Sequence, residues 1–162
     1  MHSTAEISAC YANLLVQARA LFAGESDLIA NAANLAALVF GGLPGLNWAG
    51  LYRFDGAQLL LGPFQGRPAC ARIALGRGVC GSAAMERRTQ MIADVHAFPG
   101  HIACDAASRS EIVVPLIDAD GRLLGVWDVD SPLHARFGEA DRIGMEALCA
   151  ALVEAARSGA GA

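Results

Sequence analysis

Three of the five cysteines, Cys70, Cys80 and Cys104, lie within 35 residues in the middle of the chain. Cysteine reacts as the thiolate, and nearby positive charges or a helix N-terminus lower the pKa of a thiol. Cys104 shares a loop with His101 and Arg109, and Cys80 begins a short predicted helix after a glycine turn. The pattern indicates nucleophilic or redox chemistry. Burial of all three as small hydrophobic residues is the alternative that these spacings leave open.

Three carboxylates form a second group of residues that could carry chemistry. Asp128 and Asp130 are two residues apart on a predicted strand, so both point to one face, and Glu111 begins the neighbouring strand. Charges on an otherwise apolar strand are costly to bury unless they meet a ligand or partner. Because clustered carboxylates raise one another's pKa, one of them can hold a proton and act as an acid. An exposed strand face is the alternative interpretation.

Two aromatic residues, Trp48 and Tyr52, are four residues apart on another predicted strand and share one face. They are suited to line an apolar pocket or to stack on a cation. Core packing is the commoner fate of such a pair, so these residues alone do not decide the function.

A metal site is the competing interpretation of the cysteines. Together, Cys70, Cys80, His101 and Cys104 would offer four soft ligands. The chain contains no Cys-x-x-Cys pair, however, and the spacing from Cys70 to Cys80 is wider than in the usual zinc motifs. We therefore expect no metal.

Apolar periodicity predicts helices at both ends of the chain. The predicted helices cover residues 3–23, about 26–40 and 138–157. Cys10 and Cys149 lie on apolar faces of the first and last of these helices, so we expect both to pack in the core.

The middle of the chain is predicted to form strands joined by tight turns. Asp-Gly pairs at 55–56 and 120–121 mark two hairpins. Residues 94–110 have no apolar period, and a loop of this length in a compact domain usually has a function. The predicted architecture is α+β, with a central antiparallel sheet of about six strands flanked by N-terminal helices and a C-terminal helix. The expected strands cover 48–54, 58–63, 71–75, 89–93, 111–117 and 122–129, and a short helix covers 79–86.

Length and composition fit one folded domain. The chain has 162 residues, 54% of them hydrophobic, and we expect a single domain over 1–157 with a flexible tail at 158–162. The formal net charge is −4 and all twelve basic residues are arginine, so we expect no nucleic acid partner and no lysine chemistry. No apolar run is long enough for a membrane helix and no signal peptide is evident. With an odd number of cysteines as well, a cytoplasmic protein is expected.

Several longer motifs carry a resemblance to a known family. The clearest is Gly-His-Ile-Ala-Cys-Asp-Ala-Ala-Ser at 100–108, followed by Ser-Glu-Ile-Val at 110–113. The others are Asn-Trp-Ala-Gly at 47–50, Leu-Gly-Pro-Phe-Gln-Gly at 61–66, Gly-Arg-Gly-Val-Cys-Gly at 76–81, Asp-Val-His at 94–96 and Asp-Val-Asp-Ser at 128–131. Over about residues 30–155 the chain resembles the free methionine-R-sulfoxide reductases. This resemblance implies a GAF fold, commonly a homodimer, with the sulfoxide in an enclosed pocket.

The resemblance also implies roles for the cysteines. It maps the nucleophile onto Cys104 and the main resolving cysteine onto Cys70, while Cys80 matches a further motif cysteine and is an alternative resolving residue. The implied reaction reduces free L-methionine-(R)-S-oxide to methionine through a cysteine sulfenic acid and an intramolecular disulfide. Thioredoxin is the implied external reductant, with no bound cofactor.

The resemblance implies substrate-binding roles for the remaining residues. Glu111, Asp128 and Asp130 match the family's substrate-binding carboxylates, and the two aromatic residues on the predicted strand 48–54 match its aromatic wall around the substrate methyl group. Trp127 departs from the family pattern, which has an aliphatic residue there, and we expect altered packing beside the carboxylates.

Two rival functions remain compatible with a GAF fold. A sensor that binds a small molecule without turnover would keep the pocket but need no resolving cysteine. A thiol redox switch would use a disulfide as its output. The joint presence of three cysteines and three carboxylates favours the reductase over both.

Overall fold

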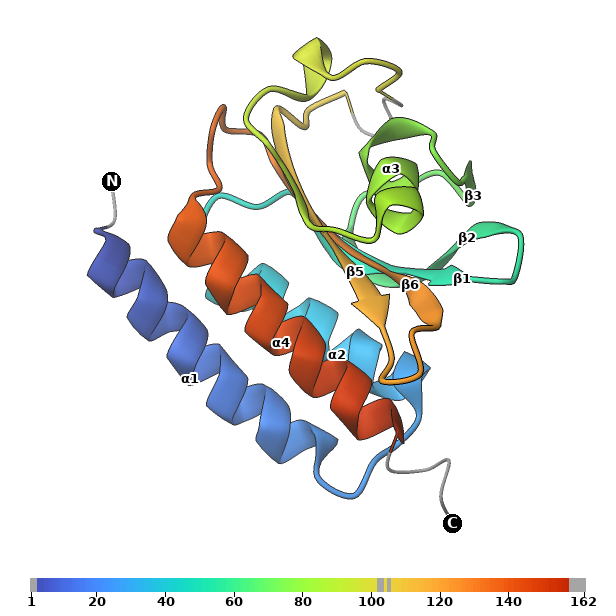
Figure 1. Cartoon of the computed structure of the whole chain (residues 1–162). Coiled ribbons are helices and arrows are strands. Elements are labelled where there is room, and N and C mark those ends of the chain that lie inside the picture. Colours follow the sequence, from blue (N-terminus) through green and yellow to red (C-terminus); the bar gives the residue numbers. More distant parts are fainter. Residues whose placement is uncertain (1–2, 102–103, 105, 158–162) are drawn as a thin grey trace.

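The computed structural model describes residues 3–101, 104 and 106–157, which form an α+β fold around one curved sheet (Figure 1). The helices are α1 (Thr4–Phe22), α2 (Leu28–Gly42), α3 (Gly78–Glu86) and α4 (Glu139–Arg157), with a short 3-10 helix η1 (Val95–Ala97). The strands are β1 (Trp48–Phe54), β2 (Gln58–Gly66), β3 (Arg72–Ala74), β4 (Gln90–Ile92), β5 (Ser110–Ile117) and β6 (Leu123–Ser131). The predicted fold class and the expected number of strands are confirmed.

The sheet is antiparallel throughout, with the strand order β3-β2-β1-β6-β5-β4. Strand β6 lies between β1 and β5, so its residues have partners on both sides. Asp130 is opposite Trp48 on β1 and Glu111 on β5, and Asp128 is opposite Val113 on β5. This register brings residues from three strands to one end and one face of the sheet.

The two faces of the sheet are covered differently. Helices α1, α2 and α4 form a layer on one face, and α3 packs against the other (Figure 1). The helical side encloses the larger core, which includes the fully buried residues Leu35, Leu51 and Leu148. The smaller core lies under α3, around Tyr52 and Leu59. The second face therefore has room for a pocket beside α3.

Local sequence signals explain where the N-terminal helices begin. The side chains of Ser3 and Glu6 each accept a hydrogen bond from the other residue's backbone N–H, which makes a capping box at the start of α1. At α2 the Asp27 carboxylate accepts a hydrogen bond from the backbone N–H of Ala30 at 2.8 Å. Asp27 therefore caps the N-terminus of α2.

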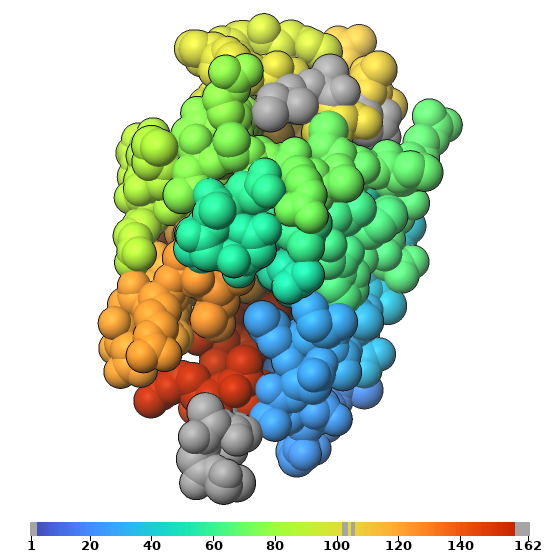
Figure 2. Space-filling model, turned by 90° about the vertical axis from the view of Figure 1, so that its right-hand side faces the viewer, coloured from blue at the N-terminus to red at the C-terminus, as the bar shows by residue number. Residues whose placement is uncertain are grey.

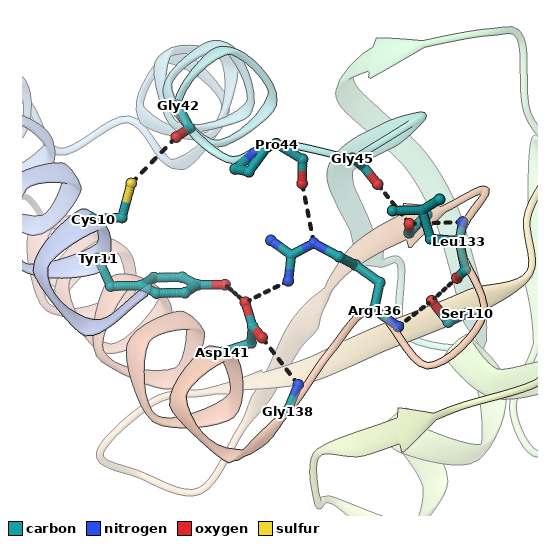
Figure 3. A network of polar contacts seen from close by, with 11 residues as sticks. Cys10, Tyr11, Gly42, Pro44, Gly45, Ser110, Leu133, Arg136, Gly138 and Asp141 are labelled. Atoms are coloured by element: carbon teal, nitrogen blue, oxygen red, sulfur yellow. Dashed lines mark hydrogen bonds and ion pairs between the residues drawn. The ribbon is translucent and has the colours of Figure 1, made fainter. Parts of the chain in front are cut away.

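A buried polar network ties α1, the segment after α2 and the start of α4 together (Figure 3). Asp141 on α4 accepts hydrogen bonds from the Tyr11 hydroxyl at 3.1 Å and from the backbone N–H of Gly138 at 2.9 Å. Arg136 forms an ion pair with Asp141 at 3.1 Å, and its Nε donates to the carbonyl of Pro44. The network fixes the chain that follows β6 and so supports the end of the sheet that carries Asp128.

Most predicted element bounds are confirmed to within two residues. The main exception is β2, which continues through Pro63 to Gly66. The predicted loop 94–110 contains η1 and ends where β5 begins, and Figure 2 shows this segment in yellow at one end of the molecule. The predicted tail at 158–162 lies outside the described residues. No helix in the described part of the chain is long and apolar enough to span a membrane.

The expectation for Trp127 is wrong. Its side chain is fully buried in the core beneath the helices, whereas the neighbouring Asp128 contributes to the pocket on the other face. Successive residues of a strand point to opposite faces, so the indole packs behind the sheet and not beside the carboxylates.

Candidate active site

A single pocket gathers most of the residues that the sequence singled out. It lies between the face of the sheet, α3 and the segments before β3 and β5. Its walls are formed by Trp48, Tyr52, Pro68, Ala69, Ile73, Arg77, Gly78, Val79, Cys80, His101, Cys104, Ser108, Glu111, Asp128 and Asp130. Both aromatic residues, all three carboxylates and two of the three clustered cysteines thus line one pocket.

Cys70 and Cys104 are joined by a disulfide, with their Cα atoms 5.5 Å apart. Cys70 lies between β2 and β3, and Cys104 lies in the segment that leads to β5. The Tyr52 hydroxyl donates a hydrogen bond to the backbone carbonyl of Cys70 at 2.9 Å. Tyr52, which lines the pocket, is therefore hydrogen-bonded to the segment that carries one of the two disulfide-bonded cysteines.

Cys80 is a separate, free thiol buried in the pocket wall as the third residue of α3. Its Sγ donates a hydrogen bond to Oε1 of Glu111 at 3.7 Å. Burial, and then the negative charge of Asp128, raise the pKa of the Cys80 thiol well above its usual range. The expectation that the helix N-terminus stabilises a thiolate here is wrong, because desolvation and the carboxylates outweigh the helix dipole.

Glu111 and Asp128 are both buried, with 6% of each residue exposed. Burial, and then the charge of Asp128, raise the pKa of Glu111 well above its usual range. Burial also raises the pKa of Asp128, to about 6. The two side chains hydrogen-bond to each other, and their burial favours the protonated form, so the pair can hold a proton that an exposed carboxyl group would lose.

One oxygen in this group has no hydrogen-bond partner among the described residues. It is Oδ1 of Asp128, which is also shielded from solvent. A buried carboxylate oxygen without a donor is unfavourable, so the pocket is suited to a ligand that brings a positive charge or a hydrogen-bond donor.

Aromatic rings form one wall of the pocket. Trp48 stacks on Tyr52 with ring centroids 5.7 Å apart and on Phe64 with centroids 5.2 Å apart. The Trp48 indole donates a hydrogen bond to the carbonyl of Arg67 at 3.2 Å, which fixes the ring. The wall is thus apolar, flat and rigid. Phe64 does not itself line the pocket but supports Trp48 by this stacking, and its place opposite Gly50 of β1 depends on strand pairing.

The loop before β5 contributes His101 and Ser108. Burial lowers the pKa of His101, so the ring is neutral at neutral pH and supplies no positive charge to Cys104. Ser108 is buried, and its hydroxyl accepts a hydrogen bond from the side-chain amide of Asn47 at 3.0 Å. Ser108 and Arg77 line the pocket as well, although sequence reasoning assigned neither a role.

Comparison with known proteins gives this pocket a context. The family model described as "GAF domain" matches residues 24–155. Free methionine-R-sulfoxide reductase from Escherichia coli is 49% identical over 142 residues, which cover 88% of this chain and 86% of that protein. The chain is therefore similar to an enzyme of that name over most of its length.

Solved structures extend the similarity. Free methionine-R-sulfoxide reductase from Neisseria meningitidis, solved in complex with its substrate, is 44% identical and covers 94% of this chain and 93% of its own, with a TM-score of 0.87. A Burkholderia vietnamiensis protein described as a GAF sensor is 64% identical, covers 96% of this chain and 99% of its own, and has a TM-score of 0.89. Both an enzyme and a protein described as a sensor thus share this fold closely.

Proposed function

The chain belongs to the GAF-domain family of free methionine-R-sulfoxide reductases, and on that premise we propose that it reduces free L-methionine-(R)-S-oxide to methionine. The observation that carries the proposal is one pocket with a cysteine of a closed disulfide, two buried carboxyl groups whose pKa values are raised, and an aromatic wall. A sulfoxide reductase needs a thiol, a proton source and a site for the methyl-sulfur group.

The proposed first step begins with the Cys70–Cys104 disulfide reduced. The Cys104 thiolate attacks the sulfoxide sulfur and the sulfoxide oxygen takes up a proton. The bond between that oxygen and the substrate sulfur then breaks, the oxygen is transferred to Cys104 as a sulfenic acid, and methionine leaves. Glu111 is the proposed proton donor, because burial and the charge of Asp128 raise its pKa inside the pocket.

The proposed second step closes the disulfide. The Cys70 thiol attacks the sulfenic sulfur of Cys104 and water leaves. The disulfide between these two cysteines supports this choice of resolving residue. Cys80 is less suited to the role, since its pKa is raised and its sulfur faces Glu111 and Asp128. Thioredoxin is the proposed reductant that restores both thiols by exchange, without a bound cofactor.

Substrate recognition follows from charge and shape. The ammonium group of a free amino acid is proposed to lie against Asp128 and Asp130, where it would give the unpartnered Oδ1 of Asp128 a donor. The methyl group is proposed to rest on the wall formed by Trp48 and Tyr52. A homodimer, which the family resemblance implies, and a cytoplasmic location, which the composition led us to expect, belong to the same proposal.

A thioredoxin-coupled assay tests the proposal. Purified protein, thioredoxin, thioredoxin reductase and NADPH are mixed with free methionine-R-sulfoxide, and NADPH oxidation is followed together with the methionine formed. The expected result is sustained turnover with one methionine formed for each NADPH oxidised. Cys10→Ser is a matched control, because this half-buried thiol lies on α1, on the other side of the sheet.

A GAF sensor is the second candidate, favoured by the description of the Burkholderia vietnamiensis protein. A sensor would bind the sulfoxide or another small molecule and form no methionine. Saturable binding by calorimetry without product in the coupled assay would establish the sensor and refute the reductase.

A further inference from the structure

We propose that Cys80, Glu111 and Asp128 form a binding site for a divalent transition-metal ion of the zinc class. The Sγ of Cys80 and one carboxylate oxygen from each acidic residue lie within 4.8 Å of one another, and all three residues are buried. This ligand set differs from the set of cysteines and His101 considered from the sequence. Two of those cysteines are joined to each other in the disulfide.

The spacing of the three ligand atoms is close to that of a metal site. Zinc lies about 2.0–2.3 Å from its oxygen and sulfur ligands, so atoms in a tetrahedral shell are roughly 3.3–3.8 Å apart. The Sγ of Cys80 is already 3.7 Å from Oε1 of Glu111. Movements of about 1 Å or less, within the range of small side-chain rotations, would complete the geometry.

An independent observation supports a cation at this position. Oδ1 of Asp128 is buried and has no hydrogen-bond partner in the described part of the chain. None of the ion pairs formed by the described residues includes Glu111 or Asp128. A cation bound at this point would satisfy the oxygen and offset the charge that burial makes costly.

The chemistry of the ligands selects the class of ion. A thiolate with two carboxylates favours zinc and its neighbours over magnesium or calcium, which prefer oxygen ligands alone. Binding would displace the protons of the Cys80 thiol and of Glu111, with the metal taking their place. Three protein ligands leave a fourth position for water, and with the disulfide closed the pocket still has a free volume of about 40 Å³.

Cobalt titration of the disulfide form tests the site. In this form Cys70 and Cys104 cannot coordinate, so a sulfur-to-cobalt charge-transfer band in the near ultraviolet must come from a remaining thiol. We expect one equivalent of Co²⁺ to produce the band and Zn²⁺ to remove it by displacement. The band should disappear in Cys80→Ser and persist in the control Cys10→Ser.

A second variant keeps the thiol and removes one oxygen ligand. Asp128→Asn should bind Co²⁺ at least about tenfold more weakly, with its fold checked by circular dichroism. The proposal is overturned if the parent protein gives no sulfur band, if Cys80→Ser keeps the full band, or if Asp128→Asn binds with unchanged affinity. None of these readouts depends on catalysis, so they remain informative whether or not the protein reduces methionine sulfoxide.

Discussion

Replacing Asp128 by asparagine removes a buried negative charge, and we predict that the variant gains stability relative to the parent protein as the pH rises. Burial raises the pKa of Asp128 from 3.8 to about 6. A carboxyl group with a higher pKa in the folded state binds more protons when folded, so it stabilises the fold at low pH. That contribution is lost between pH 3.8 and about 6, and it amounts to about 3 kcal/mol.

Urea unfolding at about pH 4 and about pH 7.5 measures this contribution. The difference in unfolding free energy between Asp128→Asn and the parent protein should shift in favour of the variant between the two pH values, by at most about 2–3 kcal/mol, because Glu111 loses the charge of Asp128 in the variant and its pKa falls. Steric effects of the amide are present at both pH values and cancel. The matched control is Asp120→Asn, which makes the same change at an exposed position in the turn between β5 and β6. An equal shift in both variants, or none in Asp128→Asn, would refute the argument.

Four further predictions concern the cysteines, the substrate and the fold. Cys104→Ser should abolish methionine formation even with excess reductant, and near-normal rates in the coupled assay would contradict its role as nucleophile. Cys70→Ser should form roughly one methionine per protein with thioredoxin and then slow, with partial rescue by a small dithiol; unchanged steady-state turnover would transfer the resolving role to another cysteine. N-acetylation of the substrate should lower kcat/KM by roughly 30-fold or more, because a buried carboxylate loses its charged partner; values within a few-fold would disprove ammonium recognition. Asp141→Asn should lower the free energy of unfolding by about 3 kcal/mol, because Arg136 is left without its buried partner, and a loss below about 1 kcal/mol in urea unfolding would show that the network in Figure 3 is dispensable.

Features that depend on neighbouring residues could be predicted from the sequence. The first hairpin is an example, because the Asp55 carboxylate accepts hydrogen bonds from the backbone N–H groups of Ala57 and Gln58, both at 3.0 Å. This turn needs nothing from the rest of the molecule, and β1 has the predicted bounds, Trp48–Phe54. The alternation along β6 likewise predicted that Asp128 and Asp130 share a face, and both line the pocket.

Features that depend on distant residues could not be predicted. Strand β2 continues past Pro63 because its pairing with β1 shifts register between Gly50 and Tyr52, and an irregular ladder can accommodate a proline that donates no hydrogen bond. The network of Tyr11, Arg136 and Asp141 joins residues from both ends of the chain, and no local pattern marks it.

The pKa of Cys80 is a further property that depends on distant residues and could not be predicted from the local sequence. Its place near the start of α3 is a local feature, and it favours a thiolate. The burial of the thiol and the nearby carboxylates come from the packing of α3 on β5 and β6, and both raise its pKa. The sequence therefore singled out a residue that lines the pocket, but its local signal predicted the wrong protonation state.

The carboxylates link the stability of the fold to the choice of ligand. A pocket that buries Asp128 without a hydrogen-bond donor for Oδ1 lowers the stability of the ligand-free protein at neutral pH. A ligand that brings a positive charge relieves this penalty when it binds, whereas a neutral ligand of the same shape does not. The free energy that it costs to bury the Asp128 carboxylate without a cationic partner thus becomes a difference in affinity between cationic and neutral ligands. The same argument applies to an ammonium group and to a metal ion. Whichever cation binds, the selectivity comes from the same feature, the buried Asp128 carboxylate on β6, whose Oδ1 has no hydrogen-bond partner among the described residues.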